Sequence, residues 1–323
     1  MRRSVTLLPV LAAILLLPAC GSEHAGTRGA GPGAASSPHR TQVDDPGTDG
    51  VRITAVTIPS ASPSPSPSPS RDYLVHADSL PADSGVLAEY EVTNDGTESL
   101  TYTVLFDFTT STGEVMGNKR ETVRDVGPGR TVRGTVRMGV LPPGASPVAR
   151  VEVAEVTKVA ADEAPPAAGV CPSSGIRVTA DRGDAAMGLR VVGLHLENCG
   201  TRDYTVNGCP RLELLDDSRE AIEGVRILRG SGGITALPEW DEQPRPVTLK
   251  PGESAVSGLV WRNTTQSGTP VDVPYVRVRA KAGADPVTVT PHLDLGTTGK
   301  LGVRPWQREQ REQSGQPEQR QQP

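Results

Sequence analysis

Apolar residues recur at every second position in several short runs of this 323-residue chain. In LTYTVLFDF, residues 100–108, the side chains of Tyr102, Val104, Phe106 and Phe108 would share one face of an extended strand. Such runs, separated by turn residues, are typical of antiparallel sheets with one buried face. The 35 glycines and 30 prolines disfavour long helices. The sequence therefore predicts an all-β protein.

The turn residues between these runs appear twice in the same order. In the first half an Asn-Asp-Gly turn at 94–96 is followed by Pro-Gly at 128–129. In the second half Asn-Cys-Gly at 198–200 is followed by Pro-Gly at 251–252. Short strands with turn signals at this spacing favour β-sandwiches. The repeated order indicates two sandwiches of related design.

We therefore expect two immunoglobulin-like β-sandwich domains, at residues 51–160 and 171–306. The stretch ADEAPPAAGV at 161–170 is the expected linker between them. The second domain has the longer interval between its two turns, and we place a long loop there, at residues 222–247.

The start of the first domain has two interpretations. VRITAVTI at 51–58 has the pattern of a strand, but the Ser/Pro-rich insert at 59–70 that follows it suits no packed core. Residues 51–58 are either the first strand of the domain or a part of the preceding tether. We favour the strand, because an isolated β-branched run in a tether would promote aggregation.

The N-terminus has the pattern of an export signal. Residues 1–20 begin with Arg2 and Arg3, continue with an apolar run at 5–17 and end on small residues before Cys20. This is the pattern of a signal peptide. The sequence LPAC resembles a bacterial lipobox, in which the cysteine receives a lipid and becomes the new N-terminus. The alternative is an ordinary secretory signal that contains a cysteine.

Both ends of the chain lack apolar periodicity. Residues 21–50 are rich in Gly, Ser, Ala and Pro and predict a disordered tether, and residues 307–323 predict a disordered Gln/Glu/Arg/Pro tail. The net charge of -5 argues against a nucleic-acid partner, which would require a basic face. We expect the lipid on Cys20 to hold the protein on the extracytoplasmic face of the cell membrane.

Two family resemblances add to this interpretation. Residues 171–306, through CPSSGIRVTADRGDAAMGLRVVGLHLENCG, PRPVTLKPGESAVSGLVWRNT and LDLGTTGKLGV, resemble the bacterial domain of unknown function 4232, common in actinomycete lipoproteins. That resemblance implies a secreted or lipid-anchored β-sandwich without a known activity. Residues 51–159, through VRITAVTI, EVTNDG, YTVLFDF and the VGPG turn, resemble the immunoglobulin-like FxLYD group. Cys209 departs from the first family, which usually has tyrosine there.

Three cysteines remain outside the cytoplasm if Cys20 carries a lipid. A pair between Cys171 and Cys199 would tie the start of the second domain to the end of a strand, and a pair between Cys199 and Cys209 would close a hairpin. We favour the first pair, with Cys209 as a free thiol. No CxxC spacing supports a metal or redox site.

The chain offers no catalytic motif of the G-x-S-x-G, H-E-x-x-H or S-x-x-K type. His195 lies between two leucines in a predicted strand, so it should face solvent. Trp240, with acidic residues at 239, 241 and 242, could bind a cation or a sugar ring, but a solvated loop is the simpler interpretation. Arg277, Arg279 and Lys281 alternate with apolar residues and predict the solvent face of a strand, with anion binding as the lesser alternative.

We therefore expect a lipid-anchored envelope protein that is not an enzyme, with no catalytic residue, cofactor or metal site. Its role would be binding or spacing, with another envelope protein or a glycan as partner. The alternative is an extracytoplasmic hydrolase or other enzyme whose site lies at the interface between the two domains.

Overall fold

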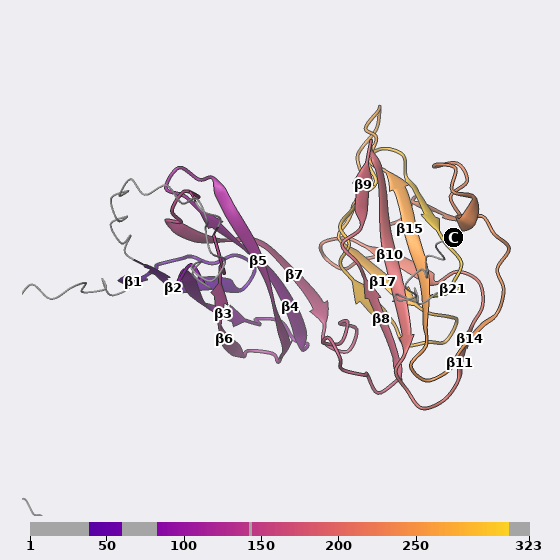
Figure 1. Ribbon diagram of the computed structural model, residues 1–323, viewed down its shortest axis with the longest axis horizontal. Helices are drawn as coiled ribbons and strands as arrows, with labels where there is room; N and C mark the ends of the chain where they lie inside the picture. Colours follow the sequence, from indigo (N-terminus) through magenta and orange to yellow (C-terminus); the bar gives the residue numbers. More distant parts are fainter. Residues whose placement is uncertain (1–38, 60–82, 142–143, 310–323) are drawn as a thin grey trace, which may run out of the picture.

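The computed structural model describes residues 39–59, 83–141 and 144–309. Over these residues the chain is all-β, as predicted, and forms two sandwiches (Figure 1). The predicted signal peptide, Cys20, and most of the predicted tether, Ser/Pro-rich insert and tail lie outside the described residues. No helix within the described residues is long and apolar enough to cross a membrane.

The N-terminal sandwich packs a four-stranded sheet on a three-stranded sheet. Side chains of alternate residues on β4, among them Phe106 and Phe108, are fully buried between the sheets, as the period-two pattern predicts. The ring of Tyr90 from the opposite sheet lies 4.8 Å from that of Phe106, centroid to centroid. In spatial order the sheets are β1 (His39–Gln42), β2 (Val51–Ile58), β3 (Leu87–Thr93) and β6 (Thr131–Arg137), then β5 (Val115–Val126), β4 (Leu100–Thr109) and β7 (Arg150–Ala160).

The first domain begins earlier than the sequence predicts. Residues 51–58 are a strand of the domain, as we favoured, but β1 precedes them and pairs antiparallel with β2 from His39 to Gln42. Residues 39–50, which we assigned to the disordered tether, are therefore part of the sandwich. Every side chain of β1 is exposed, so no apolar pattern marks this strand. It forms because its backbone groups bond to the edge of β2.

The C-terminal sandwich packs a seven-stranded sheet against a second layer of shorter strands. Leu194, Leu196, Leu259 and Leu301 are fully buried between the layers. The large sheet contains β13 (Arg226–Arg229), β20 (Lys300–Val303), β15 (Ser254–Arg262), β10 (Leu189–Asn198) and β8 (Ile176–Ala180), with β9 (Asp184–Ala186) on β10 and β21 (Gln307–Arg308) on β15. The second layer contains β12 (Arg211–Leu215), β17 (Tyr275–Arg279), β18 (Val287–Val289), β11 (Tyr204–Val206), β14 (Val247–Leu249), β16 (Asp272–Val273) and β19 (Leu293–Asp294).

Two expectations for this domain need correction. The predicted loop at 222–247 contains β13, which pairs parallel with β20, and a short 3₁₀ helix at Pro238–Trp240. The predicted tail at 307–323 begins too early, because β21 continues the sheet by pairing with β15. Both strands obtain their partners from distant parts of the chain, so local sequence does not reveal them.

The repeated turn signals fold into equivalent corners. Asn94 and Asn198 are both buried, and each side-chain amide donates to two backbone carbonyls. The carbonyl of Asn94 accepts from Gly129 N, and the carbonyl of Asn198 accepts from Gly252 N, both at 2.7 Å. Each asparagine therefore joins its strand end to the Pro-Gly turn across the sandwich, because a buried amide must find partners for all its polar atoms.

Candidate functional site

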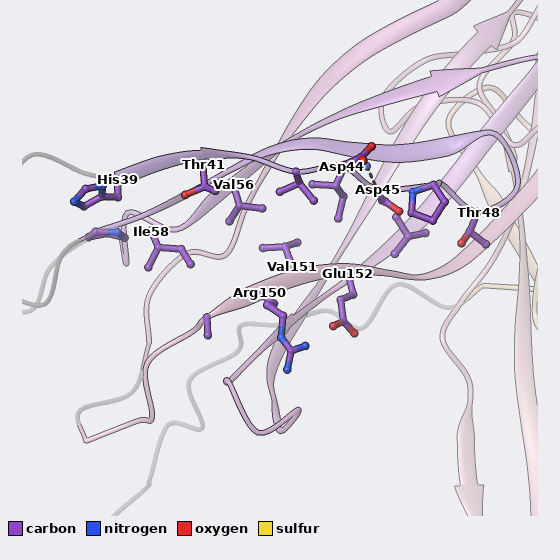
Figure 2. A pocket seen from close by; sticks show the side chains of 16 residues that line it. His39, Thr41, Asp44, Asp45, Thr48, Val56, Ile58, Arg150, Val151 and Glu152 are labelled. Carbon is purple, nitrogen blue, oxygen red and sulfur yellow. Dashed lines mark hydrogen bonds between the residues drawn. The ribbon is translucent and has the colours of Figure 1, made fainter.

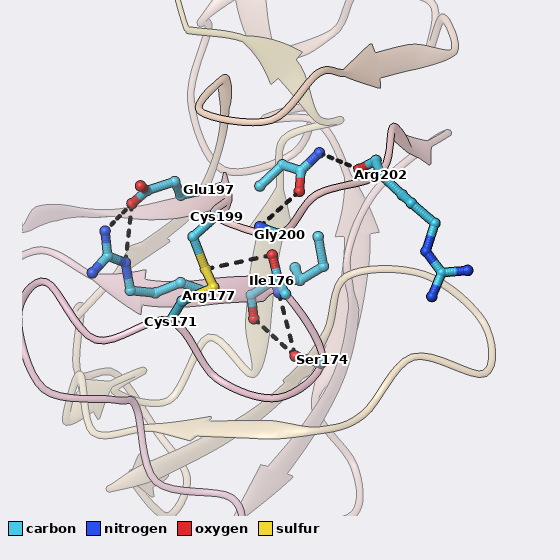
Figure 3. Close-up of a disulfide and its surroundings, with 10 residues drawn as sticks. Cys171, Ser174, Ile176, Arg177, Glu197, Cys199, Gly200 and Arg202 are labelled. Atoms are coloured by element: carbon cyan, nitrogen blue, oxygen red, sulfur yellow. Dashed lines mark hydrogen bonds and ion pairs between the residues drawn. A yellow bond between two sulfur atoms is a disulfide. The ribbon is translucent and has the colours of Figure 1, made fainter.

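The structure confirms the favoured disulfide, between Cys171 and Cys199, with the two Cα atoms 5.7 Å apart (Figure 3). The bridge ties the entry of the C-terminal domain to the turn after β10. The backbone approaches closely beside it: a Cβ on Gly175 would lie 3.0 Å from the Cα of Gly200, and Gly175 has φ +73. Only glycine fits there. The disulfide therefore has a structural role, because both of its sulfur atoms are bonded to each other.

Cys209 is a free thiol, as predicted, and is half-buried. Its Sγ lies 3.6 Å from the carbonyl oxygen of Val303. Burial raises the pKa of the Cys209 thiol, and the nearby Arg229 opposes that rise only in part. The thiol therefore stays protonated at neutral pH, which makes it a poor nucleophile.

Cys209 lies in a pocket of about 520 Å³ whose charged lining is entirely basic. We call it the cationic pocket and define it by Asn207, Cys209, Arg211, Arg229 and Lys281. Its residues come from the turn between β11 and β12, from β12, from the end of β13 and from the turn after β17. Of these three cations, only Lys281 was among the residues for which the sequence suggested anion binding as an alternative.

His195 lies at the surface of the C-terminal domain, on β10. Its side chain is 42% exposed, in agreement with the predicted solvent face. Nε2 lies 3.5 Å from Asp181 and Nδ1 lies 3.9 Å from Glu309, both at the surface. Within the described residues no group of three His, Cys, Asp or Glu side chains could hold a metal ion.

The prediction that Trp240 lies in a solvated loop is wrong for its indole ring, which is buried. Trp240 is only 6% exposed, and a Cβ added to Gly258 would clash with its ring. The neighbouring Asp241 accepts hydrogen bonds from the backbone and the hydroxyl of Ser231, at 2.8 and 3.0 Å. Trp240 therefore packs on the large sheet and offers no free face to a sugar ring.

A groove of about 710 Å³ opens on the N-terminal domain between β1 and β2 on one side and β7 on the other (Figure 2). Val56, Ile58 and Val151 contribute apolar surface to it. Figure 2 shows the side chains of Arg150 and Glu152 directed away from β1. The groove could take an apolar segment, but its titratable groups do not converge on one point.

The junction between the domains centres on Glu163, from the stretch that we expected to be a linker. Its Oε2 accepts from Arg277 Nε at 2.8 Å and from Thr288 Oγ1 at 2.7 Å. Arg277 also donates to Glu213 at 2.8 Å. These bonds, Glu163 first, raise the pKa of the Arg277 guanidinium. The linker is therefore fastened to the face of the C-terminal domain.

Further contacts across the junction come from both domains directly. The backbone N–H of Lys158, on β7, donates to the hydroxyl of Tyr275 at 3.2 Å, and burial raises the pKa of that hydroxyl. Val159, Leu215 and Tyr275 form a small apolar cluster of their own. Two polar contacts between the domains accompany it, an ion pair of Arg219 with Glu98 at 2.5 Å and a contact of His292 Nε2 with Glu155 Oε1 at 2.8 Å. These contacts join side chains of the two domains directly.

A hollow of about 1050 Å³ lies beside the junction, where the enzyme alternative would place its site. Glu98, Arg124, Glu163 and Asp285 are among its lining residues. Glu98 and Glu163 are held by arginines from the C-terminal domain, and Arg124 donates to the carbonyl of Pro165 at 2.6 Å. These three lining residues are therefore engaged in contacts at the junction.

The C-terminal half of the chain matches a known family. Residues 171–307 match the domain of unknown function DUF4232, which agrees with the resemblance given above and with the bounds of the second sandwich. No curated protein matches the chain. The lipobox and the FxLYD resemblance stay predictions.

Proposed function

We propose that the protein is a non-catalytic binding module of the cell envelope, anchored by a lipid on Cys20 at the extracytoplasmic face of the membrane. The signal-like residues 1–20 support the anchor. The Cys171–Cys199 disulfide supports an oxidising location outside the cytoplasm. An envelope protein or a glycan is the expected class of partner.

One observation carries the non-catalytic assignment. Two carboxylates at the junction are already bound by other side chains, Glu163 by Arg277 and Thr288, and Glu98 by Arg219. A catalytic carboxylate needs an environment that leaves its proton free to move to and from a substrate. Paired groups of this kind instead bind the linker to the C-terminal domain and connect the two sandwiches, which suits the presentation of a binding surface at a distance from the membrane.

The anchor is tested by replacing the lipidated residue. In a bacterial host that processes lipoproteins, we expect the parent chain to take up labelled palmitate and to sediment with membranes. Cys20→Ala should lose the label and most of the membrane-bound fraction, because no other acyl chain would hold it. The control is Cys209→Ala, which removes a thiol of the C-terminal domain and should keep both properties. Retention of Cys20→Ala in the membrane, equal to the parent, would refute the anchor.

A further inference from the structure

The cationic pocket concentrates positive charge in a chain whose net charge is -5. Arg211, Arg229 and Lys281 line it, and Arg279 stands directly opposite Arg211 in the pairing of β12 with β17. Like charges directly opposite each other on neighbouring strands destabilise a sheet. The stability of the sheet therefore does not explain why these positive charges lie together.

Among the described residues, the cations at and beside the pocket have no neutralising partner, although some other arginines of the domain, such as Arg177 and Arg277, do. Within the part of the chain that the structure describes, no carboxylate lies within 4.0 Å of Arg211, Arg229, Arg279 or Lys281. Arg277, two residues before Arg279 on the same strand, has two such carboxylates, Glu163 and Glu213. On this strand, therefore, Arg277 is neutralised by carboxylates of the protein, whereas the charge of Arg279 is not.

Some donors of the pocket are already held in place by the protein. Lys281 Nζ donates to the carbonyl of Thr205 at 2.9 Å and lies 4.0 Å above the ring of Tyr204. Arg279, which is not among the residues that line the pocket, donates to the carbonyl of Ala284 at 2.7 Å. Arg229 lines the same pocket as Cys209 and opposes the rise in the pKa of its thiol. Carbonyls and rings position these cations without neutralising them, so an anion can still recover their charge.

We propose that the cationic pocket binds a multiply charged oxyanion of the phosphate class. Three cations around about 520 Å³ exceed what one carboxylate would neutralise, whereas a phosphate group carries up to two charges and accepts from several guanidinium forks. Arg211 and Arg229, from two different strands, supply these forks. The side chain of Asn207 adds an uncharged donor at the same pocket.

The test is calorimetric titration of the full-length chain in detergent micelles at low ionic strength. The probes are inorganic pyrophosphate and, for comparison, acetate. We expect saturable one-to-one binding of pyrophosphate that weakens as sodium chloride is added, and no measurable binding of acetate. Arg211→Gln and Arg229→Gln should each weaken binding about tenfold. Both side chains are exposed, so both variants should keep the parent circular dichroism spectrum.

The matched control is Arg202→Gln, which removes the same charge from an exposed position on the same domain. It should leave the affinity for pyrophosphate within about twofold of the parent. The proposal would be overturned if Arg202→Gln weakened pyrophosphate binding as much as the pocket variants do, or if acetate bound as well as pyrophosphate. It would also be overturned if the chain bound neither pyrophosphate nor the anionic lipid vesicles described in the next paragraph.

Two further readouts locate the ligand and identify its source. Bound pyrophosphate should slow alkylation of Cys209 by iodoacetamide in a Cys20→Ala chain, because the thiol lies inside the pocket. Vesicles of phosphatidylcholine with and without phosphatidylglycerol test a lipid phosphate as the source. Arg211-dependent binding to the anionic vesicles would assign the site to a headgroup, and binding of pyrophosphate alone would assign it to a soluble phosphate. Alkylation at an unchanged rate in saturating pyrophosphate would place the anion elsewhere and overturn the assignment.

Discussion

Replacing both Cys171 and Cys199 with alanine lowers the free energy of unfolding of the C-terminal domain by about 3.5 kcal/mol. The two residues are 28 positions apart, and in the chain-entropy model this closed loop restricts the unfolded state by that amount. For a domain of this size, the melting temperature should fall by roughly 10 °C. Differential scanning calorimetry of the oxidised parent and the double variant measures the change.

The N-terminal sandwich serves as an internal reference for this experiment. Its core is separate from that of the C-terminal domain and contains no cysteine, so its transition should stay within about 2 °C of the parent. Cys209→Ala is the matched control, because it removes a cysteine of the same domain that forms no bridge. A double variant that melts with the parent, or a Cys209→Ala chain that falls as far as the double variant, would contradict a structural role for the disulfide.

Trp306→Ala has an effect of similar or larger size, about 4 kcal/mol on the C-terminal domain. The side chain is 2% exposed, and its indole N–H donates to the carbonyl of Ala280 at 2.9 Å. Its backbone N–H donates to the carbonyl of Gly208, next to Cys209, at 2.9 Å. The substitution therefore leaves a cavity and an unsatisfied carbonyl. Urea unfolding followed by circular dichroism measures the loss.

Trp306→Phe separates the two contributions. It keeps most of the buried ring but leaves the carbonyl of Ala280 without its donor, so we expect a loss of about 2 kcal/mol. The alanine variant should also alkylate faster at Cys209, because the wall of the cationic pocket beside Gly208 is loosened. Equal stability of the parent and Trp306→Ala would show that this residue does not close the core.

Much of the fold could be predicted because its signals are local. The alternation in 100–108 fixes which side chains of β4 are buried, and the paired Asn and Pro-Gly turns mark both corners that Asn94 and Asn198 occupy. The pair of Cys171 at the domain entry with Cys199 at a strand end was favoured over a pair of Cys199 with Cys209, and the structure confirms it. Each of these features depends on residues that are close together in the chain or strongly restricted in their chemistry.

The features that escaped prediction depend on distant partners. β1 has only exposed side chains, and β13 sits in a Gly-rich stretch, so each is a strand only because a remote strand, β2 or β20, offers its edge. Glu163 lies in a stretch whose composition predicts a linker. Its partner Arg277 is more than a hundred residues away in the chain. The cationic pocket likewise joins Arg211, Arg229 and Lys281 from three separate segments.

The junction around Glu163 should hold the two sandwiches in one arrangement in solution, and a distance measurement between the domains tests this. Spin labels at Val115→Cys and Met187→Cys, in a chain that also carries Cys20→Ala and Cys209→Ala, report the distance between the domains by double electron–electron resonance. Both labelled positions are exposed, at 50% and 100%. We predict a single narrow distance distribution that broadens when Glu163→Ala is added. A broad distribution before that substitution, or a narrow one unchanged by it, would contradict the fixed arrangement.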